Sequence, residues 1–332
     1  MTARRVAIVG ATGAVGLEFL AVLAARDFPL RDLRLFASPR SAGSRLPFRG
    51  EHLPVEPLSE AGLAGVELAL FSAGGAVARQ WAPRAVAAGA VVVDNSSAFR
   101  LDAEVPLVVP EVNAEALRGH RGVIANPNCS TILLALALGP LHRAAGLRRA
   151  VVSTYQAASG AGQQAMLELR SSLQAVLAGE PAPAPRALPQ PLAFNVFPQV
   201  DVFMPDGYTK EEDKLLYEMR KILGLPQLLV DATCVRVPVE RCHSESVAVE
   251  LARPLPVAEA RALLASAPGL ELVDDPAARQ YPMPLVQAGR DAVAVGRLRA
   301  GRAFEHGLTF WLAGDQLRKG AALNAVQIAE RL

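Results

Sequence analysis

The chain has 332 residues, which is enough for two domains. Hydrophobic residues make up 51%, charged residues 20%, and the formal net charge is +2, as in a globular protein with a sizeable core. The even spread of charge excludes a nucleic-acid-binding patch. Three irregularly spaced cysteines indicate a reducing compartment. We find no signal-peptide pattern and no membrane-spanning run, so we expect a cytoplasmic protein with no membrane partner.

Short apolar runs alternate with helical stretches near the start of the chain. Strands are predicted over 6–9, 33–37, 68–71, 91–93 and 107–109, and helices over 16–25 and 77–88. Continuously apolar strands that alternate with helices predict a parallel sheet covered on both faces. We therefore expect a Rossmann-like α/β domain over residues 1–130.

The first strand runs into a glycine-rich turn, Gly10–Gly16. Glycines spaced three apart permit a tight turn and let the backbone approach a pyrophosphate at the start of the next helix. This favours nucleotide binding over a plain strand–helix turn. A second turn, Ser72-Ala73-Gly74, either approaches the same nucleotide or only ends its strand.

The end of the second strand indicates which nucleotide is preferred. An NAD site usually has a carboxylate here for the ribose 2′-hydroxyl, but residues 38–43 contain none. Ser38, Arg40 and Ser41 can instead hold a 2′-phosphate, with Arg40 supplying a charge-assisted hydrogen bond. The alternative for Arg40 is a solvated loop side chain. We predict NADP as the cofactor.

The pattern changes after residue 130. Helices are predicted over 131–145, 163–177, 210–223 and 318–331, and strands over 150–155, 232–239, 246–251, 292–299 and 307–312. The proline-rich stretch 181–191 is predicted as a loop or an extended arm. Longer alternating strands predict an α+β domain with a mixed sheet, whose open face can form a subunit contact.

Cys129 lies where the strand-like run 122–125 passes into a helix. Unpaired N–H groups and the helix dipole at a helix N-terminus favour a thiolate, which is nucleophilic. The alternative is a buried, inert cysteine. A thiol that attacks a carbonyl is usually assisted by a histidine, and His243 lies among Arg236, Arg241 and Cys242. For an isolated histidine a structural role is the default. Cys242 has no further ligand pair at zinc spacing, so no metal is predicted.

Seven motifs in order resemble the aspartate-β-semialdehyde dehydrogenases of bacteria over nearly the whole chain. They are GATGAVG (10–16), ASPRSAG (37–43), DNSSAFR (94–100), NPNCST (126–131), STYQAASGAG (153–162), RVPVERCHSES (236–246) and DQLRKGAALNAVQIAE (315–330). The resemblance implies that Cys129 forms an acyl-thioester, that His243 is the general acid/base, and that Gln156 orients the substrate.

The resemblance also implies a set of binding residues. Substrate binding falls to Arg236 (carboxylate), Glu211 (amine), Arg100 and Lys214 (phosphate), and Asn128. Arg236 precedes His243 by seven residues, so in one ideal strand the two side chains would point to opposite faces. A bulge, a bend or a strand end is therefore needed for both side chains to reach one site. Cofactor contacts are expected from Gly10, Thr12, Gly13, Ala14, Val15, Ser38, Arg40, Ser41, Ser72, Ala73, Gly74, Ser159, Gly160 and Gln316. Gln316 replaces the family's usual Asn, which contacts the nicotinamide amide.

The expected reaction is the reversible, NADP-dependent reductive dephosphorylation of L-4-aspartyl phosphate to L-aspartate 4-semialdehyde. It belongs to lysine, diaminopimelate, threonine and methionine biosynthesis. The expected domains are 1–130 for NADP, 131–314 for catalysis and dimerisation, and 315–332 as a helix returning to the first domain. We expect a homodimer, with a tetramer as the alternative. Rival functions are N-acetylglutamyl-phosphate reductase, glyceraldehyde-3-phosphate dehydrogenase, or a catalytically silent paralogue.

Overall fold

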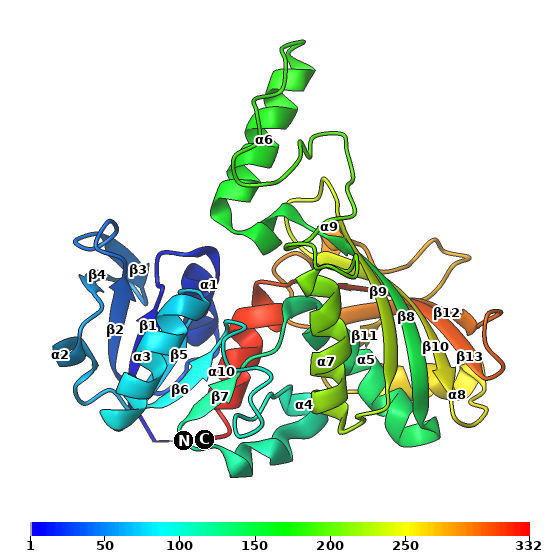
Figure 1. The fold of residues 1–332 in the computed structure, drawn as a ribbon, viewed down its shortest axis with the longest axis horizontal. Coiled ribbons are helices and arrows are strands. Elements are labelled where there is room, and N and C mark those ends of the chain that lie inside the picture. The colour runs from blue at the N-terminus through cyan, green and yellow to red at the C-terminus, as the bar shows by residue number, and fades with distance from the viewer. Residues whose placement is uncertain (1) are drawn as a thin grey trace. The chain divides into compact units, whose positions relative to one another are not determined.

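The computed structural model describes residues 2–332 and divides into two compact units. The first unit comprises Met1–Asn128 and Ala321–Leu332, and the second comprises Cys129–Gly320. Figure 1 shows that each unit contains its own sheet with helices packed against it. The chain passes from one unit to the other after residues 128 and 320, whereas the domain boundaries expected from the sequence followed residues 130 and 314.

The first unit is built on a seven-stranded sheet in the order β3-β4-β2-β1-β5-β6-β7. Neighbouring strands are parallel except in the β3–β4 hairpin at one edge, which the sequence did not predict. The strands are β1 (Arg4–Val9), β2 (Leu30–Ala37), β3 (Arg45–Phe48), β4 (Glu51–Pro57), β5 (Leu68–Phe71), β6 (Val91–Asp94) and β7 (Val123–Ala125). Residue Leu107 makes only an isolated bridge to Ala125, so the strand expected over 107–109 is wrong.

Helices cover both faces of this sheet. Val6 and Ile8 of β1 share a core with helices α1 and α10, whereas Ala7 and Val9 share a second core with α3. Because successive strand side chains point to opposite faces, a continuously apolar strand needs a helical layer on each side. The predicted doubly covered sheet is thus confirmed. The helices of this unit are α1 (Ala14–Ala25), α2 (Glu60–Leu63), α3 (Gly75–Ala87), α4 (Pro110–Asn113), η1 (Ala114–Gly119) and α10 (Leu323–Ala329).

The C-terminal segment of the chain packs inside the first unit. The side-chain amide of Asn324 donates to the carbonyl of Val108 at 2.9 Å and to Asn126 Oδ1 at 2.7 Å. Glu330 forms an ion pair with Arg26 at 2.6 Å. The single helix expected over 318–331 is instead a π-helical turn, η3 (Arg318–Ala322), followed by α10. Such wide turns are frequent at functional sites.

The second unit is built on a six-stranded sheet in the order β11-β12-β13-β10-β8-β9. The β11–β12 and β8–β9 pairs are parallel and the others are antiparallel, so the predicted mixed sheet is confirmed. The strands are β8 (Leu147–Gln156), β9 (Leu229–Arg236), β10 (His243–Leu251), β11 (Leu270–Leu272), β12 (Val293–Ala300) and β13 (Gly307–Gly314). Helices are α5 (Cys129–Ala145), η2 (Ala158–Ala161), α6 (Gln163–Leu177), α7 (Lys210–Leu223), α8 (Val257–Ser266) and α9 (Pro284–Gln287).

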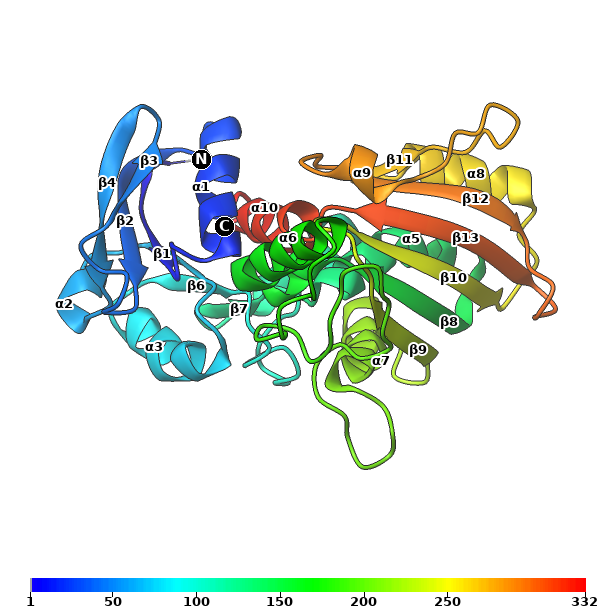
Figure 2. The same cartoon turned by 90° about the horizontal axis from the view of Figure 1, so that it is seen from above.

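The two faces of this sheet differ in character. Helices α5, α7 and α8 pack against the sheet, and Figure 2 shows α5 running alongside β10 and β13. On the opposite side of β8, Val151 and Tyr155 are exposed, and the ring of Tyr155 lies 5.0 Å from that of Trp311. The inward and outward positions alternate along β8, which gives the sheet one covered face and one open face.

Strand β9 ends earlier than the sequence suggested. It stops at Arg236, and residues 237–242 form a loop before His243 begins β10. The expected strand over 232–239 is therefore wrong in its last three residues. Arg236 and His243 lie in different strands, which removes the conflict created by their seven-residue separation.

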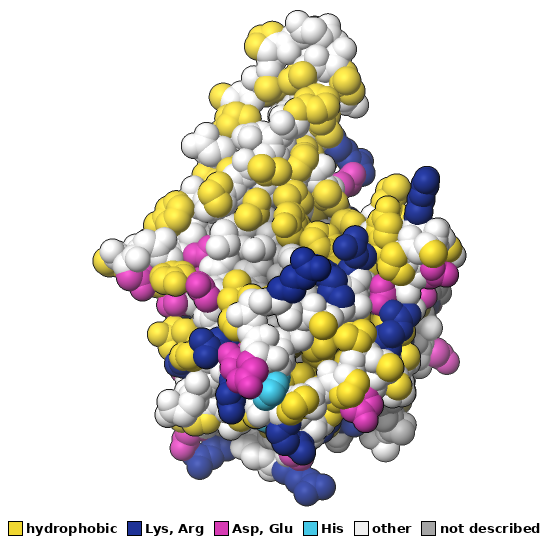
Figure 3. Space-filling view, turned by 90° about the vertical axis from the view of Figure 1, so that its right-hand side faces the viewer, with side chains coloured by type: hydrophobic (Ala, Val, Ile, Leu, Met, Phe, Trp, Pro, Cys, Tyr) yellow, Lys and Arg dark blue, Asp and Glu magenta, His cyan; other side chains and the backbone are white. Residues whose placement is uncertain are grey.

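Hydrophobic side chains are exposed at several places on the surface. Figure 3 shows them gathered in the upper half of that view, the level at which α6 projects in Figure 1. Leu177 at the end of α6 is 76% exposed, and Leu285 of α9 is 90% exposed. The proline-rich stretch 181–191, all of it described, contains no helix or strand. Among residues 2–332, no helix is long and apolar enough to cross a membrane.

Glu245 of β10 is a buried carboxyl group within the second sheet. It lies opposite Thr154 and Leu312, it is 0% exposed, and neither carboxylate oxygen has a hydrogen-bond partner among the described residues. Burial raises the pKa of Glu245 well above its ordinary value of 4.5. The side chain is therefore held as a neutral acid in the folded protein.

Replacing Glu245 by glutamine should change how stability depends on pH. A raised folded-state pKa means that stability falls as pH rises through the unfolded-state pKa near 4.5. Relative to Glu245→Gln, the wild type should lose about 1.4 kcal/mol of unfolding free energy per pH unit above that value. Denaturant melts from pH 5 to 8 measure the difference. Glu180→Gln, at an exposed position, is the control, and parallel curves for wild type and Glu245→Gln would contradict the expectation.

Candidate functional site

Cys129 is the first residue of helix α5 and of the second unit. Its side chain is partly accessible, and no acidic residue lies in the first turn of α5. The η3 turn packs closely here, because a Cβ added to Gly320 would lie 3.1 Å from the Cβ of Cys129. The first turn of α5 thus adds no negative charge beside the sulfur, which favours a thiolate.

His243 begins β10 and is completely buried. The backbone N–H of Ala157 donates to His243 Nδ1 at 3.0 Å, and Gln156 Nε2 lies 3.4 Å from His243 Nε2. Burial, followed by the positive charge of Arg236, lowers the pKa of His243 to about 3. The imidazole is therefore neutral over the physiological pH range.

Gln156 ends β8 and lies directly opposite Arg236, the last residue of β9. The hydroxyl of Thr154 donates to Gln156 Oε1 at 3.0 Å, and Gln156 Nε2 donates to Glu211 Oε1 at 3.1 Å. Each end of the amide thus has a defined partner, which fixes its orientation.

Arg236 is 95% buried, and its Nη1 donates to the carbonyl of Ala157 at 2.6 Å. Its Nε has no hydrogen-bond partner in the part of the chain that the structure describes. Burial lowers the pKa of Arg236, although the nearby negative charges of Glu211 and a Cys129 thiolate oppose that effect. A buried guanidinium with an unused donor is suited to an anionic substrate group.

Glu211 and Lys214 lie on one face of α7. Lys214 Nζ is 2.8 Å from Glu211 Oε2 and 2.8 Å from Asp201 Oδ2. Burial disfavours the charge on Lys214, but the two carboxylates outweigh it and raise the pKa of Lys214. The helix is fixed at its start by a capping box between Thr209 and Glu212.

The turn that carries Gln316 holds two other parts of the second unit together. Gln316 Oε1 accepts from the backbone N–H of Cys242 at 2.8 Å, and Gln316 Nε2 donates to the hydroxyl of Ser159. A Cβ on the neighbouring Gly160 would come within 3.0 Å of both the His243 ring and Arg236 Nη1. The nicotinamide contact expected of Gln316 stays a prediction.

The nucleotide-binding expectations concern the first unit. Helix α1 follows Gly13 without a side-chain cap and has no acidic residue in its first turn, so its N–H groups suit a phosphate. A Cβ on Gly10 would lie 2.3 Å from the Ser72 carbonyl oxygen, so only glycine lets these two turns approach. Gly74, at the start of α3, has a φ of 85° and open space around it. These features fit a dinucleotide.

The segment expected to hold a 2′-phosphate forms a compact turn after β2. The N–H of Ser41 donates to the carbonyl of Ser38 at 2.9 Å. Arg40 is exposed, and its guanidinium makes no hydrogen bond or ion pair within residues 2–332. The side chain is therefore available for a phosphate.

Two predicted substrate residues, Arg100 and Asn128, also belong to the first unit, and both are buried. Arg100 Nε donates to the carbonyl of Asn126 at 2.9 Å, and Arg100 Nη2 donates to the carbonyl of Asn95 at 2.9 Å. These bonds fix the position of the guanidinium. Asn128 directly precedes Cys129 in the chain.

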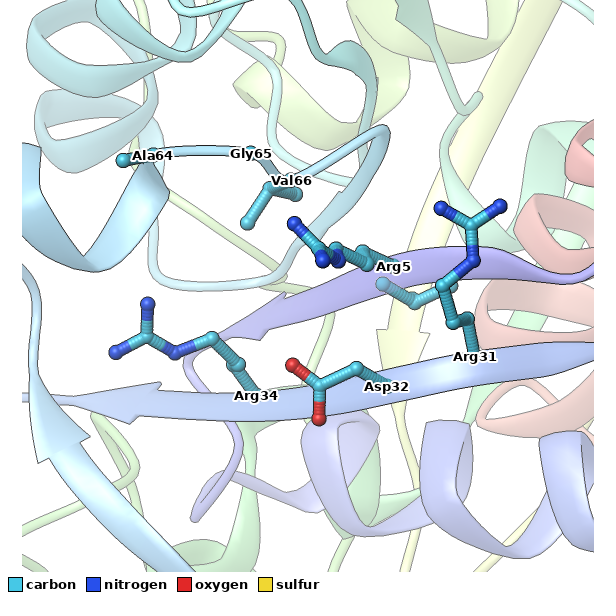
Figure 4. A pocket seen from close by; sticks show the side chains of 8 residues that line it. Arg5, Arg31, Asp32, Arg34, Ala64, Gly65 and Val66 are labelled. Carbon is cyan, nitrogen blue, oxygen red and sulfur yellow. The ribbon is translucent and has the colours of Figure 1, made fainter.

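A pocket of about 400 Å³ in the first unit is lined by Arg5, Arg31, Asp32 and Arg34. Figure 4 shows these side chains on β1 and β2 beside the loop of Ala64, Gly65 and Val66. It lies near the amino-terminal ends of the strands, whereas nucleotides bind at the carboxyl ends. Arg34 is already paired with Glu56 at 2.7 Å. In the described chain no group of three His, Cys, Asp or Glu residues is placed to hold a metal.

Three residues that support the site, Thr154, Cys242 and Asp315, were not assigned that role from the sequence. Thr154 lies two residues before Gln156 on the same face of β8, a spacing that could have revealed it. Cys242 has a φ of 79°, which no sequence pattern indicates for a cysteine. Asp315 is fully buried, pairs with Arg241 at 2.6 Å and accepts from the N–H groups of Leu317 and Arg318.

Comparison with known proteins identifies the family. The sequence model described as "Semialdehyde dehydrogenase, NAD binding domain" matches residues 5–120, and "Semialdehyde dehydrogenase, dimerisation domain" matches residues 138–319. An aspartate-semialdehyde dehydrogenase of Synechocystis is 52% identical, with 99% of this chain and 97% of that protein covered.

Solved structures agree. The Vibrio cholerae aspartate semialdehyde dehydrogenase II complexed with ASA superposes with a TM-score of 0.97 at 45% identity, covering 100% of this chain and 98% of that one. The Candida albicans aspartate semialdehyde dehydrogenase with NADP gives 0.76 at 25% identity, covering 100% and 98%. The chain therefore belongs to the aspartate-semialdehyde dehydrogenase family of oxidoreductases.

Proposed function

We propose that this enzyme is NADP-dependent and converts L-4-aspartyl phosphate and L-aspartate 4-semialdehyde into one another through an acyl-thioester on Cys129. The observation that carries this is the buried network of Gln156, Arg236, Glu211 and His243 in the unit whose helix α5 begins with Cys129. The Vibrio cholerae relative, which is complexed with ASA, supports the substrate.

The substrate groups are assigned by charge. The unused Nε of Arg236 binds the substrate carboxylate, and the carboxylate of Glu211 binds the ammonium group. Arg100 and Lys214 supply the positive charge for the phosphate, and Asn128 contributes a polar group beside the nucleophile. With Glu211 and Asp201 raising the pKa of Lys214, its ammonium group stays charged throughout the working pH range.

In the reductive direction Cys129 attacks the acyl phosphate as a thiolate, and the C–O bond to phosphate breaks. NADPH, when bound, supplies a hydride to the thioester carbonyl. The resulting hemithioacetal releases the aldehyde and restores the thiolate. His243 acts at the carbonyl oxygen, and Gln156 holds the acyl group beside the sulfur.

The cofactor is assigned to the first unit, with Ser159, Gly160 and Gln316 of the second unit assigned to its nicotinamide end. The turns at Gly10, Thr12, Gly13, Ala14 and Val15, and at Ser72, Ala73 and Gly74, supply N–H groups for the pyrophosphate. Ser38, Arg40 and Ser41 hold the 2′-phosphate. The NADP named for the Candida albicans relative supports this choice.

We further propose that the enzyme serves the pathways to lysine, diaminopimelate, threonine and methionine and works as a homodimer. The family's dimerisation domain covers the second unit, and the open face of its sheet carries Val151, Tyr155 and Trp311. A tetramer would be a pair of such dimers.

An assay of phosphate-dependent NADP reduction with three aldehydes tests the proposed reaction. Aspartate semialdehyde should exceed N-acetylglutamate semialdehyde and glyceraldehyde 3-phosphate by about 10²-fold or more in kcat/KM, because only it presents carboxylate and ammonium groups to Arg236 and Glu211. Cys129→Ser, with a native melting curve, is the control and should be inactive. Preference for either rival aldehyde, or activity in the Cys129→Ser protein, would overturn the proposal.

Replacing Arg40 by aspartate tests the cofactor. The KM for NADP should rise roughly 10- to 100-fold, since a charge-assisted bond becomes a repulsion, while the KM for NAD should change little. Steady-state kinetics with both cofactors measure the effect. Arg118→Asp, at another exposed arginine of the first unit, controls for general charge effects. Equal changes in both KM values would show that Arg40 does not contact the 2′-phosphate.

A further inference from the structure

The ammonium group of Lys214 is paired with more negative charge than it balances. Its Nζ lies 2.8 Å from Glu211 Oε2 and 2.8 Å from Asp201 Oδ2. Burial opposes the charge of Lys214, but the two carboxylates outweigh burial and raise the pKa of Lys214. One ammonium and two carboxylates together carry net negative charge. These three side chains, as they stand, do not attract a phosphate.

Binding of the substrate's ammonium group does not by itself make this region positive. When that group binds Glu211, as proposed above, two positive charges face two negative charges, and the sum is neutral. A phosphate group carries about two negative charges near neutral pH and gains no net attraction from a neutral region. Lys214 can therefore serve a phosphate only if one of its carboxylate partners withdraws.

Glu211 is the partner that stays in place. Its side chain is only 6% exposed, and its Oε1 accepts from Gln156 Nε2 at 3.1 Å. It lies in the first turn of α7, which the capping box between Thr209 and Glu212 fixes. Withdrawal of Glu211 would break a buried hydrogen bond and leave the Gln156 donor without its partner.

Asp201 differs from Glu211 in both respects. It lies outside α7, in the loop that precedes the helix, and its side chain is 33% exposed, so water can replace Lys214 as its partner. Asp201 Oδ1 accepts from the N–H of the next residue, Val202, at 2.8 Å, a bond that moves with the loop. Among residues 2–332, Lys214 is the one side chain that pairs with the Asp201 carboxylate. Asp201 is thus the exchangeable partner.

We propose that Asp201 is a further residue of the phosphate subsite, whose carboxylate pairs with Lys214 in the free enzyme and is displaced by phosphate. The inference rests on the proposed assignment of Lys214 to phosphate and deepens it. An ammonium group has three rotatable donors, so Lys214 exchanges one anion for another while it keeps its bond to Glu211. The carboxylate of Asp201 also spares the empty site a half-paired, largely buried lysine.

This exchange has a consequence for the release of phosphate. In the reductive direction phosphate is a product, and the returning Asp201 carboxylate competes with it for Lys214. In the oxidative direction the same competition weakens the binding of phosphate. Asp201 therefore sets the affinity for phosphate without touching the carboxylate or ammonium groups of the other substrate.

Replacing Asp201 by asparagine tests the competition. The φ of Asp201 is 68°, in the left-handed region that asparagine also tolerates, so the variant loses the charge and keeps the backbone. The KM for phosphate should fall about 3- to 10-fold, the size expected for removal of a partly exposed charged competitor. The kcat and the KM for aspartate semialdehyde should stay within about twofold. Steady-state kinetics of phosphate-dependent NADP reduction measure all three.

Two further variants complete the kinetic test. Asp201→Gly removes the side chain, suits the same left-handed backbone and should show the same fall in the KM for phosphate. Asp206→Asn removes a charge from the same loop and should leave the KM for phosphate unchanged, since Asp206 accepts only from the N–H of Tyr208. A KM for phosphate that is unchanged or raised in both Asp201 variants would overturn the proposal.

Hydrogen exchange of the loop tests the displacement without turnover. The loop 201–208 is closed by the N–H of Met204, which donates to the carbonyl of Tyr208 at 2.8 Å, and Asp201 ties its start to α7. Inorganic phosphate added to the wild type should speed amide exchange in this loop roughly threefold or more, because the tie is released. Asp201→Asn and Lys214→Gln should show no response to phosphate, and sodium chloride at equal ionic strength is the control.

The two experiments separate the inference from the reaction on which it rests. If phosphate supports turnover but leaves loop exchange in the wild type unchanged or slower, Asp201 stays on Lys214 and the inference alone is wrong. If phosphate neither supports turnover nor changes loop exchange, the proposed phosphate subsite is wrong and the inference falls with it.

Discussion

The pairing register of strands β8, β9 and β10 is the constraint on which the second unit depends. Gln156 ends β8 opposite Arg236 at the end of β9, and His243 begins β10 immediately beyond the pair of Ser244 with Tyr155. The backbone N–H of Ala157 then donates to His243, and the backbone carbonyl of Ala157 accepts from Arg236. A slip of one residue in either pairing would turn the polar side chains to the opposite face of the sheet.

Much of this arrangement could be predicted from the sequence. Apolar β1 and its glycine turn defined the first unit, and NPNCST placed Cys129 at a helix start. The resemblance to a known family supplied roles that spacing alone could not. The end of β9 was missed because Val237 and Val239 continue the β-branched pattern, although the chain there leaves the ladder.

Other features depend on contacts between distant parts of the chain and have no local sequence signal. The donor for His243 Nδ1 is the backbone of Ala157, which any residue except proline would provide. The left-handed conformation of Cys242 is held by Gln316, 74 positions away. Asp315 is fully buried and paired with Arg241, although the two residues lie 74 positions apart.

The burial of the other two cysteines has a practical consequence. Burial raises the pKa values of Cys234 and Cys242 well above the ordinary thiol value, and both side chains are 0% exposed, whereas Cys129 is partly accessible. A thiol reagent added to the folded protein therefore has one available sulfur per chain, and the same reagent in denaturant has three. The ratio of the two stoichiometries gives the fraction of intact Cys129 thiols in any preparation, before an assay is run.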